Sequence, residues 1–348
     1  MIQKDNSNSR NPKEKLDLQE KIKGTKFDEL FELMDEIKSG SVGRVCKAKF
    51  KKLKTDRFAA CKFLISEKSR GTREEENTIH KENEHMEILI HGKLKHKNIP
   101  NIYGYYKIKD GKCITMEFTK YGDLENFKRT ILKRSSISET LICYIAGQIL
   151  ESLFYLHMNK IIHMDIKQQN ILIDEYLNAK LTDFSVSINY KSSKKRINLP
   201  RVGTCYYISP EVLNYKTIDV KEASKIDIYS FGVLLYVLAF ADYPYELVNV
   251  DHHDYDKILQ NIEEKELKFK EDSGHSNMFK NFLKKCLEKN IKKRYNIYEA
   301  LRDPWIKGYK IILDEKEKLY NAGKLLINLM VDGIIEYNEY IKDKKEDN

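Results

Sequence analysis

The residues best suited to chemistry lie in one segment, between Ile161 and Ser185. Asp165 and Asn170 stand on a short polar stretch between two apolar runs, and Asp183 follows another short run of strand-like residues. Carboxylate and amide oxygens brought together by paired strands suit Mg²⁺, a hard cation that prefers oxygen ligands. A further carboxylate beside them could orient an attacking hydroxyl. Asp and Asn also make loop turns routinely, so a single one of these residues would favour a structural role.

The spacing of these residues narrows the interpretation. The run His-Met-Asp-Ile-Lys-Gln-Gln-Asn at 163–170, followed by Asp-Phe-Ser at 183–185, resembles the catalytic loop and the metal-binding motif of eukaryotic protein kinases. The resemblance covers roughly residues 30–305. It implies an α+β, bilobal fold in which a small, mainly β N-lobe with one main helix precedes a larger, mostly α C-lobe. The predicted parts are a polar N-terminal tail over 1–27, a kinase domain over 28–305 with lobes of about 28–118 and 123–305, and a helical C-terminal extension over 306–348.

The resemblance implies a role for each residue of this segment. Asp165 would orient the substrate hydroxyl and accept its proton, and Lys167 would neutralise charge on the transferred group. Thr204 would contact both of them. Asn170 and Asp183 would hold Mg²⁺ against the phosphates of ATP. A Lys at position 167 resembles the Ser/Thr-specific branch of the family, so the implied activity is phosphoryl transfer to Ser and Thr hydroxyls of proteins.

A glycine-containing turn is predicted to approach the phosphates of ATP. Gly40 and Gly43 would let backbone N–H groups come close to phosphate oxygens. Within the resemblance this turn matches the family's Gly-rich loop, with Lys38 in place of the first of three glycines. We expect Lys38 to stiffen the loop without abolishing nucleotide binding.

Lys62 follows an apolar run with a strand pattern and resembles the lysine that grips the α- and β-phosphates in the family. Family spacing makes Glu87 the carboxylate that pairs with Lys62, and Glu84 one turn earlier on the same helix face is the rival candidate. The resemblance also implies adenine contacts from side chains and from hinge backbone, and a ribose contact from a carboxylate. The residues in these roles are Val45, Ala60, Met116, Glu117, Thr119, Asp123 and Leu172.

Two further departures from the family pattern affect regulation. Met164 stands where many kinases carry an Arg that pairs with a phosphate on the activation segment. Because Met cannot make that pair, we hypothesise activity that does not require activation-segment phosphorylation. Ser185 replaces the glycine after Asp183-Phe184, and Ser tolerates a positive φ less well than Gly. We therefore expect the backbone there to be biased toward one conformer.

The activation segment is expected over 186–211, and its basic side chains suggest attraction to acidic protein substrates, although a solvated loop is the alternative. Gln169 sits where Arg-directed kinases often carry Glu, so a strongly basic consensus substrate is not expected. Glu211 is predicted to form a buried, structural ion pair with Arg294. The basic residues of the segment are Lys191, Lys194, Lys195 and Arg196.

Hydrophobic patterns predict the elements that support the site. Strands are predicted within 31–50, over 57–65 and over 113–118, and helices over 73–94, 138–159 and 226–240. Ser138 is a candidate N-cap, and Asp227 would anchor the backbone of the catalytic loop. A helical pattern over 313–345 would pack on its own C-lobe, or alternatively bind a partner.

Composition sets wider limits. The 348 residues carry 62 Lys and Arg against 53 Asp and Glu, a net charge of +9 that we interpret as favouring solubility. Six scattered cysteines lack metal-ligand spacing, which indicates reduced thiols. The first residues lack the apolar core of a signal peptide, and the longest apolar stretch is too short to span a bilayer. We expect a cytoplasmic protein with neither nucleic-acid nor membrane partners.

Two other function classes compete with an active protein kinase. A kinase-like scaffold without catalysis would agree with the departures at Lys38, Met164 and Ser185. None of the three removes a group that would bind metal or move a proton, so the active enzyme is favoured. A small-molecule or lipid kinase on the same fold is disfavoured, because the stretch from Gly203 to Glu211 resembles a platform for protein substrates.

Overall fold

The computed structural model describes residues 23–40, 43–53, 57–65, 87–109, 111–133, 135–190, 195–214, 217–245, 250–251, 254–270 and 274–310. Of the helix predicted over 73–94, residues 87–94 are described; residues 87–91 are helical, and the chain turns at 92–93, so the helix ends earlier than predicted. The helix predicted over 313–345 lies outside the described residues, as does most of the predicted tail over 1–27.

The chain forms two compact units. The first comprises Met1–Lys95 and Pro100–Thr119, and the second comprises His96–Ile99 and Lys120–Asn348. The short stretch His96–Ile99 joins the second unit because Asn98 is buried there. Its side-chain amide donates to Gln148 Oε1 at 3.1 Å and to the carbonyl of Ala179 at 2.9 Å.

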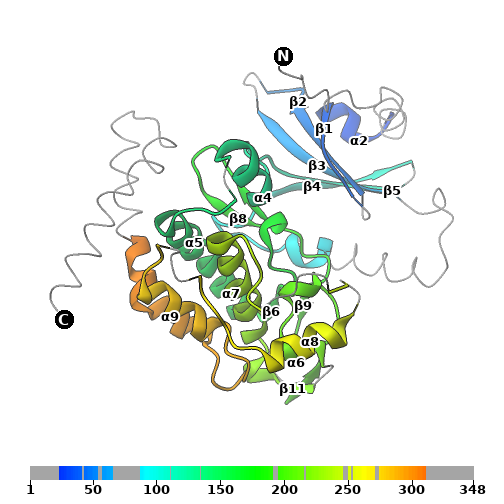
Figure 1. The fold of residues 1–348 in the computed structure, drawn as a ribbon. Coiled ribbons are helices and arrows are strands. Elements are labelled where there is room, and N and C mark those ends of the chain that lie inside the picture. Colours follow the sequence, from blue (N-terminus) through cyan, green and yellow to red (C-terminus); the bar gives the residue numbers. More distant parts are fainter. Residues whose placement is uncertain are drawn as a thin grey trace. The chain divides into compact units, whose positions relative to one another are not determined.

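The first unit is built on one antiparallel sheet of five strands in the order β1-β2-β3-β5-β4. Val, Ile, Phe and Tyr are frequent in its strands, as expected for a pleated sheet with two packed faces. The short helix α2 precedes the sheet and lies beside it (Figure 1). These elements are α2 (Lys26–Leu30), β1 (Phe31–Gly40), β2 (Gly43–Phe50), β3 (Phe58–Ile65), β4 (Ile102–Ile108) and β5 (Gly111–Glu117).

The two faces of this sheet carry separate apolar clusters. One cluster contains Phe31, Cys46, Cys61 and Phe63, and Phe27 from α2 closes it with no exposed surface. Phe27 was placed in the N-terminal tail by the sequence prediction, and its burial shows that ordered structure begins before residue 28. The upstream segment contains too few apolar residues to reveal a helix of only five residues.

The second unit is mostly helical, and the long helix α7 packs against α5 and α9 (Figure 1). Its elements up to the catalytic loop are α4 (Leu124–Asn126), a π-helical turn (Phe127–Ile131), α5 (Glu139–Met158), β6 (Ile161–Ile162), a 3₁₀ turn (Gln168–Asn170) and β7 (Ile171–Ile173). The elements of the next stretch are β8 (Ala179–Leu181), β9 (Ile188–Asn189), β10 (Arg196–Asn198), a 3₁₀ turn (Cys205–Tyr207), α6 (Pro210–Leu213), β11 (Thr217–Asp219) and a 3₁₀ turn (Val220–Glu222). The last are α7 (Lys225–Phe240), α8 (Tyr255–Glu264), α9 (Asn277–Cys286) and α10 (Ile297–Arg302).

The long helices agree with the sequence prediction. Ser138 caps α5 by accepting a hydrogen bond from the backbone N–H of Leu141, at 3.4 Å. Every residue of α7 is buried, as predicted for a core helix. Ile306 and Tyr309 are also buried, and residues 304–310 are helical, so the beginning of the predicted C-terminal extension packs within this unit. The expected fold class, a small β unit followed by a larger α unit, is confirmed.

Within the part of the chain that the structure describes, two helices are long and apolar enough to cross a bilayer by length and composition. They are Glu139–Met158 and Val220–Phe240, and 78% and 94% of their most apolar windows are buried inside the fold. Core helices of folded domains pass the same test, so the two helices are weak evidence for a membrane span.

All six cysteines are free thiols. Cys46 lies opposite Cys61 in the β2–β3 pairing, and Cys113 belongs to the same buried cluster. Burial, together with a hydrogen bond involving Cys61, raises the pKa of Cys113 well above its usual value. A buried thiol of raised pKa is a poor nucleophile, so these cysteines act as small core residues.

Candidate active site

The predicted lysine–glutamate pair is present in the first unit. Lys62 Nζ lies 2.8 Å from both Oε1 and Oε2 of Glu87, which is 2% exposed. This geometry selects Glu87 over Glu84, which lies outside the described residues. A carboxylate that receives one ammonium on both oxygens fixes the position of that ammonium on the sheet.

A buried histidine helps to support the helix that carries Glu87. His91, one turn further along, is 1% exposed, and its Nε2 lies 2.8 Å from the carbonyl oxygen of Pro100. The buried, polar side chain of His91 is therefore accommodated by a hydrogen bond to the chain segment that precedes β4.

One face of the sheet gathers the predicted adenine-contacting side chains of this unit. Ala60 and Met116 face each other across β3 and β5, and Val45 packs against the same cluster as a partly buried residue. Val45 is also paired with Lys62 across β2 and β3. The structure therefore places an apolar surface beside the lysine, as an adenine site next to a phosphate site would require. The nucleotide contacts themselves stay predictions.

The glycine turn at the end of β1 has one position that requires glycine. Gly43 has a φ of +152°, and a Cβ there would lie 2.1 Å from the carbonyl oxygen of Phe63. Gly40 pairs with Gly43, and Lys38 pairs with Val45 and is exposed. Gly43 thus permits the close approach of β2 to β3, which is a structural reason for one glycine of this turn.

The remaining predicted nucleotide contacts occur at the ends of the two units. In the first unit the backbone N–H of Glu117 donates to Asn101 O at 2.8 Å, and Thr119 is buried. In the second unit Asp123 forms an isolated β-bridge with Leu172. The Asp123 carboxylate caps α4 by accepting from the N–H of Asn126 at 2.9 Å, so a ribose contact would share it with the cap.

The catalytic loop is held by a carboxylate from α7. Asp227 has no exposed surface, and it accepts the backbone N–H of His163 at 2.9 Å and that of Met164 at 3.0 Å. The Nε2 of His157 lies 2.9 Å from the same carboxylate. Met164 has a φ of +71°, an uncommon conformation for a residue with a side chain. The two hydrogen bonds that Asp227 accepts stabilise this turn, in agreement with the anchoring role predicted for Asp227.

Four polar groups converge on Asp165. Its Oδ1 accepts from the N–H and the Oγ1 of Thr204, at 2.9 and 2.8 Å. Its Oδ2 accepts from Asn170 Nδ2 at 2.8 Å and lies 2.7 Å from Lys167 Nζ. Lys167 also donates to Thr204 Oγ1 at 2.6 Å. The sequence-predicted catalytic residues Asp165, Lys167 and Thr204 are therefore in direct contact in the second unit.

The two predicted Mg²⁺ ligands sit at one end of the β7–β8 hairpin. Ile171 pairs with Leu181, and the N–H of Thr182 donates to Asn170 O at 2.9 Å, so Asn170 and Asp183 end adjacent strands. Asn170 directs its amide NH₂ to Asp165, which leaves its side-chain carbonyl oxygen as the ligand atom. Asp183 has a φ of +67°, so the chain turns sharply at the second ligand.

This donor set fits Mg²⁺. It consists of a carboxylate and an amide carbonyl, and Mg²⁺ usually takes one or two protein oxygens and completes its shell with water and phosphate oxygens. No group of three or more His, Cys, Asp or Glu side chains able to hold a metal occurs among the residues that the structure describes. The assignment of Mg²⁺ to Asn170 and Asp183 stays a prediction.

Ser185 does not have the positive φ that would favour a glycine at this position. Within the described residues the positive φ of this motif occurs at Asp183, and Ser185 lies in a turn without one. The intervening Phe184 has no exposed surface, and its ring lies 5.1 Å from that of His163. Serine can therefore replace glycine here without backbone strain.

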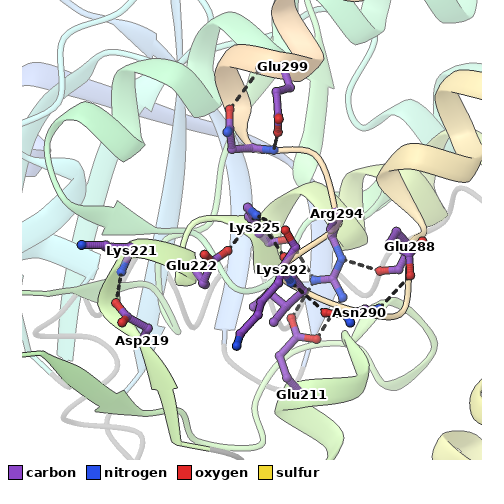
Figure 2. Close-up of polar contacts among 12 residues, drawn as sticks. Glu211, Asp219, Lys221, Glu222, Lys225, Glu288, Asn290, Lys292, Arg294 and Glu299 are labelled. Atoms are coloured by element: carbon purple, nitrogen blue, oxygen red, sulfur yellow. Dashed lines mark hydrogen bonds and ion pairs between the residues drawn. The ribbon is translucent and has the colours of Figure 1, made fainter.

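The end of the activation segment is tied to the C-terminal unit by a buried ion pair, as predicted. Arg294 Nη1 and Nη2 donate to the two oxygens of Glu211 at 2.7 and 3.0 Å, and Arg294 Nε donates to the carbonyl of Glu288 at 2.8 Å. Figure 2 shows Glu211 and Glu288 on two sides of the guanidinium. Both members of the ion pair are buried, which makes it structural rather than catalytic.

Arg201 was not predicted from the sequence to be a functional residue. The structure places it in three contacts at the end of the activation segment. Its Nε donates to the carbonyl of Leu213 at 2.6 Å, its Nη2 lies 3.3 Å from Asp256 Oδ1, and its guanidinium lies 5.1 Å from the ring centroid of Tyr255. A single arginine forms no sequence pattern that would identify the residues it contacts. Only the tertiary fold brings its partners to it.

Comparisons with known proteins agree with this geometry. A family model for the protein kinase domain matches residues 31–306. The chain is 32% identical over 282 residues to serine/threonine-protein kinase dst2 of Dictyostelium discoideum, a match that covers 81% of this chain and 23% of dst2. It is 29% identical over 293 residues to human death-associated protein kinase 2, covering 82% and 74% of the two chains. Human NUAK family SNF1-like kinase 1 is 27% identical over 304 residues, covering 87% and 42%.

The fold and the residues around Asp165 define a protein with a kinase domain. The chain belongs to the eukaryotic protein kinase family, and the relatives above place it with the Ser/Thr kinases. Because the match spans 23% of dst2 and 42% of the NUAK kinase, the activities and partners of those whole proteins are not carried over.

Proposed function

We propose that this chain is an active Ser/Thr protein kinase, which transfers the γ-phosphate of ATP to protein hydroxyls without needing activation-segment phosphorylation. The observation that carries the proposal is the set of contacts on Asp165. Thr204, Lys167 and Asn170 all bind this carboxylate at 2.9 Å or less. A general base has to be held in one orientation to be effective, and these contacts orient both of its oxygens.

Each side chain of the proposed site has a defined task. Asp165 receives the proton of the substrate hydroxyl as the new O–P bond forms. Lys167, 2.7 Å from Asp165, supplies a fixed positive charge for the transferred group. Mg²⁺ and ATP are the proposed cofactors, and bound Mg²⁺ supplies charge neutralisation at the phosphates. Lys62, fixed by Glu87, is proposed to bind the α- and β-phosphates.

Two observations support independence from activation-segment phosphorylation. The first is Met164, which is 4% exposed and carries no charge to pair with a phosphate. The second is the composition of residues 195–203, which contain no Ser, Thr or Tyr. This stretch leads directly to Thr204, and the nearest upstream hydroxyls of the segment, Ser192 and Ser193, lie at least eleven residues before the residue that binds Asp165. Treatment of the purified protein with phosphatase should leave its activity unchanged.

Transfer of radiolabelled phosphate from ATP tests the proposed kinase activity. Wild-type protein should label itself or a general acceptor protein, and Asp165→Ala and Asp183→Ala should each remove nearly all of the signal. Glu175→Gln, at an exposed acid outside the site, is the control and should label as the wild type does. Equal labelling by the wild type and both site variants would contradict the proposal.

The competing function is a kinase-like scaffold that binds nucleotide and partner proteins without catalysis. The departures at Lys38, Met164 and Ser185 motivate it. It predicts that nucleotide binds, as measured by calorimetry with MgATP, while no label is transferred under any condition. Absence of both binding and transfer would contradict the scaffold as well as the enzyme.

The substrate class and the setting are also proposals. We propose protein substrates with acidic sequences near the acceptor, because Lys195 and Arg196 make the activation segment basic. A peptide-library phosphorylation profile tests this preference. Residues 313–345, outside the described residues, are proposed as a helix that packs on the C-lobe or binds a partner, and the proposed location is the cytoplasm.

A further inference from the structure

The stretch between β10 and Thr204 is fixed to the second unit by backbone pairing and by buried apolar side chains. Arg196 to Asn198 form the antiparallel pair β10–β11 with Thr217 to Asp219. The N–H of Val220 extends this pairing by donating to Lys195 O at 3.1 Å. Leu199 and Ile218 are buried beside the pair, so backbone hydrogen bonds and apolar packing both stabilise this part of the activation segment.

Arg201 holds the next part of the segment through a helix end. Its Nε donates to the carbonyl of Leu213 at 2.6 Å, and Leu213 is the last residue of α6. Carbonyls in the last turn of a helix lack partners within the helix, and a cation there also interacts favourably with the helix dipole. A short hydrogen bond from a charged donor is among the stronger contacts available to a loop.

The same guanidinium reaches α8. Its Nη2 lies 3.3 Å from Asp256 Oδ1, and its Cζ lies 5.1 Å from the ring centroid of Tyr255. The Asp256 side chain is 90% exposed, so this ion pair is screened by solvent and contributes little. The Arg201 side chain is only 17% exposed, because Leu213 and Tyr255 cover it. The bond to Leu213 is therefore the main anchor.

The anchor lies three residues before Thr204. Between them, Gly203 has a φ of +103°, and a Cβ there would lie 2.6 Å from the carbonyl oxygen of Met164. The chain thus passes against the catalytic loop at Gly203 and then places the N–H and Oγ1 of Thr204 on Asp165. A loop that contains a glycine needs fixed points on both sides to keep one conformation. Arg201 is the charged side chain nearest to this glycine on its N-terminal side.

We propose that Arg201 is a positioning residue, which holds Thr204 against Asp165 and so replaces the phosphate-dependent ordering that Met164 cannot provide. The proposal rests on the proposed kinase activity. In this proposal Arg201 acts through Thr204. The alternative is that Arg201 stabilises the fold of the second unit and has no specific effect on the Asp165 site.

The proposed role depends on the shape of the guanidinium group of Arg201, and not on its positive charge alone. Its Nε and Nη2 bind two different elements at once, and its Cζ lies over the ring of Tyr255. A lysine has one ammonium and cannot bind both elements while covering the ring. Arg201→Lys should therefore recover only part of what Arg201→Ala loses, although it keeps the charge.

The test compares Arg201→Ala and Arg201→Lys with a matched control. Lys270 donates to the carbonyl of Phe240, the last residue of α7, at 3.2 Å, so Lys270→Ala removes a similar contact away from the activation segment. We expect Arg201→Ala to lower kcat by roughly 10- to 100-fold, because small displacements of a catalytic group have effects of this size. The KM for MgATP should change less than about twofold. Lys270→Ala should keep the kcat of the wild type.

Hydrogen exchange at the backbone N–H of Thr204 gives a readout that does not depend on activity. Exchange should accelerate at least about tenfold in Arg201→Ala, by an intermediate factor in Arg201→Lys and not in Lys270→Ala, because the N–H would open to solvent more often.

Unchanged exchange and kcat in a folded Arg201→Ala would overturn the proposal. If Arg201→Ala does not fold, Arg201→Lys decides in the same way. If the wild type has no activity, the kinase function fails while the exchange result still decides whether Arg201 positions Thr204.

Discussion

Thr204 donates two hydrogen bonds to a single oxygen of Asp165, one from its backbone N–H at 2.9 Å and one from its Oγ1 at 2.8 Å. The hydroxyl also accepts from Lys167 Nζ at 2.6 Å. Thr204 therefore connects the proposed base and the proposed charge-neutralising lysine, and its hydroxyl holds them in a fixed relation.

The first prediction concerns this hydroxyl. Thr204→Val keeps the shape of the side chain but removes the hydroxyl's hydrogen bonds to Asp165 and Lys167, while the backbone N–H bond to Asp165 remains. We expect kcat to fall by about 10- to 100-fold, within the range that positioned acid–base groups contribute, with little change in the affinity for MgATP. Steady-state kinetics with a peptide substrate measures both quantities. Thr204→Ser is the control and should retain most of the activity, and equal losses in Val and Ser variants would contradict the assignment.

Much of this site could be predicted from the sequence because its residues are near one another in the chain. Asp165, Lys167 and Asn170 lie within one loop, so their spacing alone indicates a shared location. Asp183 follows a short strand that pairs back onto β7, and short hairpins of this kind are local. Glu211 and Arg294 are far apart in sequence, and only the family resemblance predicted their pairing.

The contacts that the sequence did not predict depend on tertiary packing. Phe27 precedes the sheet in a segment with few apolar residues, and its burial depends on aromatic side chains from Phe31, Phe63 and Tyr106. Arg201 binds a helix end and a second helix that lie 12 and 55 residues further along the chain. Neither kind of contact leaves a periodic pattern, since each requires the fold to be known first.

The second prediction concerns Met164, whose side chain is 4% exposed. Restoring the family residue with Met164→Arg would bury a charge, and we expect the free energy of unfolding to fall by about 2 kcal/mol. Met164→Leu conserves the volume and should change it by less than about 1.5 kcal/mol. Urea unfolding measures both. The Arg variant should also remain insensitive to phosphatase, because residues 195–203 contain no Ser, Thr or Tyr, and Ser192 and Ser193 lie at least eleven residues before Thr204. Phosphatase-dependent activity in this variant would contradict the prediction.

The third prediction concerns the buried ion pair between Glu211 and Arg294. Glu211→Ala would leave a buried guanidinium without its carboxylate, and the free energy of unfolding should fall by about 3–5 kcal/mol. Arg294→Lys should also be destabilising, because one ammonium cannot replace donors that reach Glu211, Glu288 and Lys225 together. Figure 2 shows these partners around the guanidinium.

Denaturant unfolding measures both variants of the ion pair, with the exposed Glu175→Ala as the control, which should change the free energy of unfolding by less than about 0.5 kcal/mol. A Glu211→Ala protein as stable as the control variant would show that the pair does not hold the activation segment to this unit.

The last prediction concerns the pH dependence of stability through Glu139, the first residue of α5. Its Oε1 accepts from Ser276 Oγ at 2.6 Å and from Trp305 Nε1 at 2.9 Å, and its Oε2 accepts from the N–H of Ser276 at 2.7 Å. Burial raises the pKa of Glu139, but hydrogen bonds from His275, Ser276 and Trp305 together outweigh burial, so the pKa is lowered overall.

A carboxylate whose pKa is lower in the folded than in the unfolded state stabilises the fold wherever it is ionised in both states. This contribution is present at neutral pH. It is lost as the pH falls below the ordinary Glu value of about 4.3 and through the lower value of the folded state. Glu139→Gln removes the charge, and at pH 7 the free energy of unfolding should fall by about 2 kcal/mol, the scale of hydrogen bonds to a charged group. The difference between the wild type and Glu139→Gln should stay nearly constant in unfolding experiments from pH 7 to about pH 5, and should shrink as the pH falls below about 4.3. Glu299→Gln, at an exposed helix cap, is the control and should change the free energy of unfolding by less. If the free-energy difference between the wild type and Glu139→Gln instead widens toward acid pH, then burial, and not hydrogen bonding, dominates at Glu139.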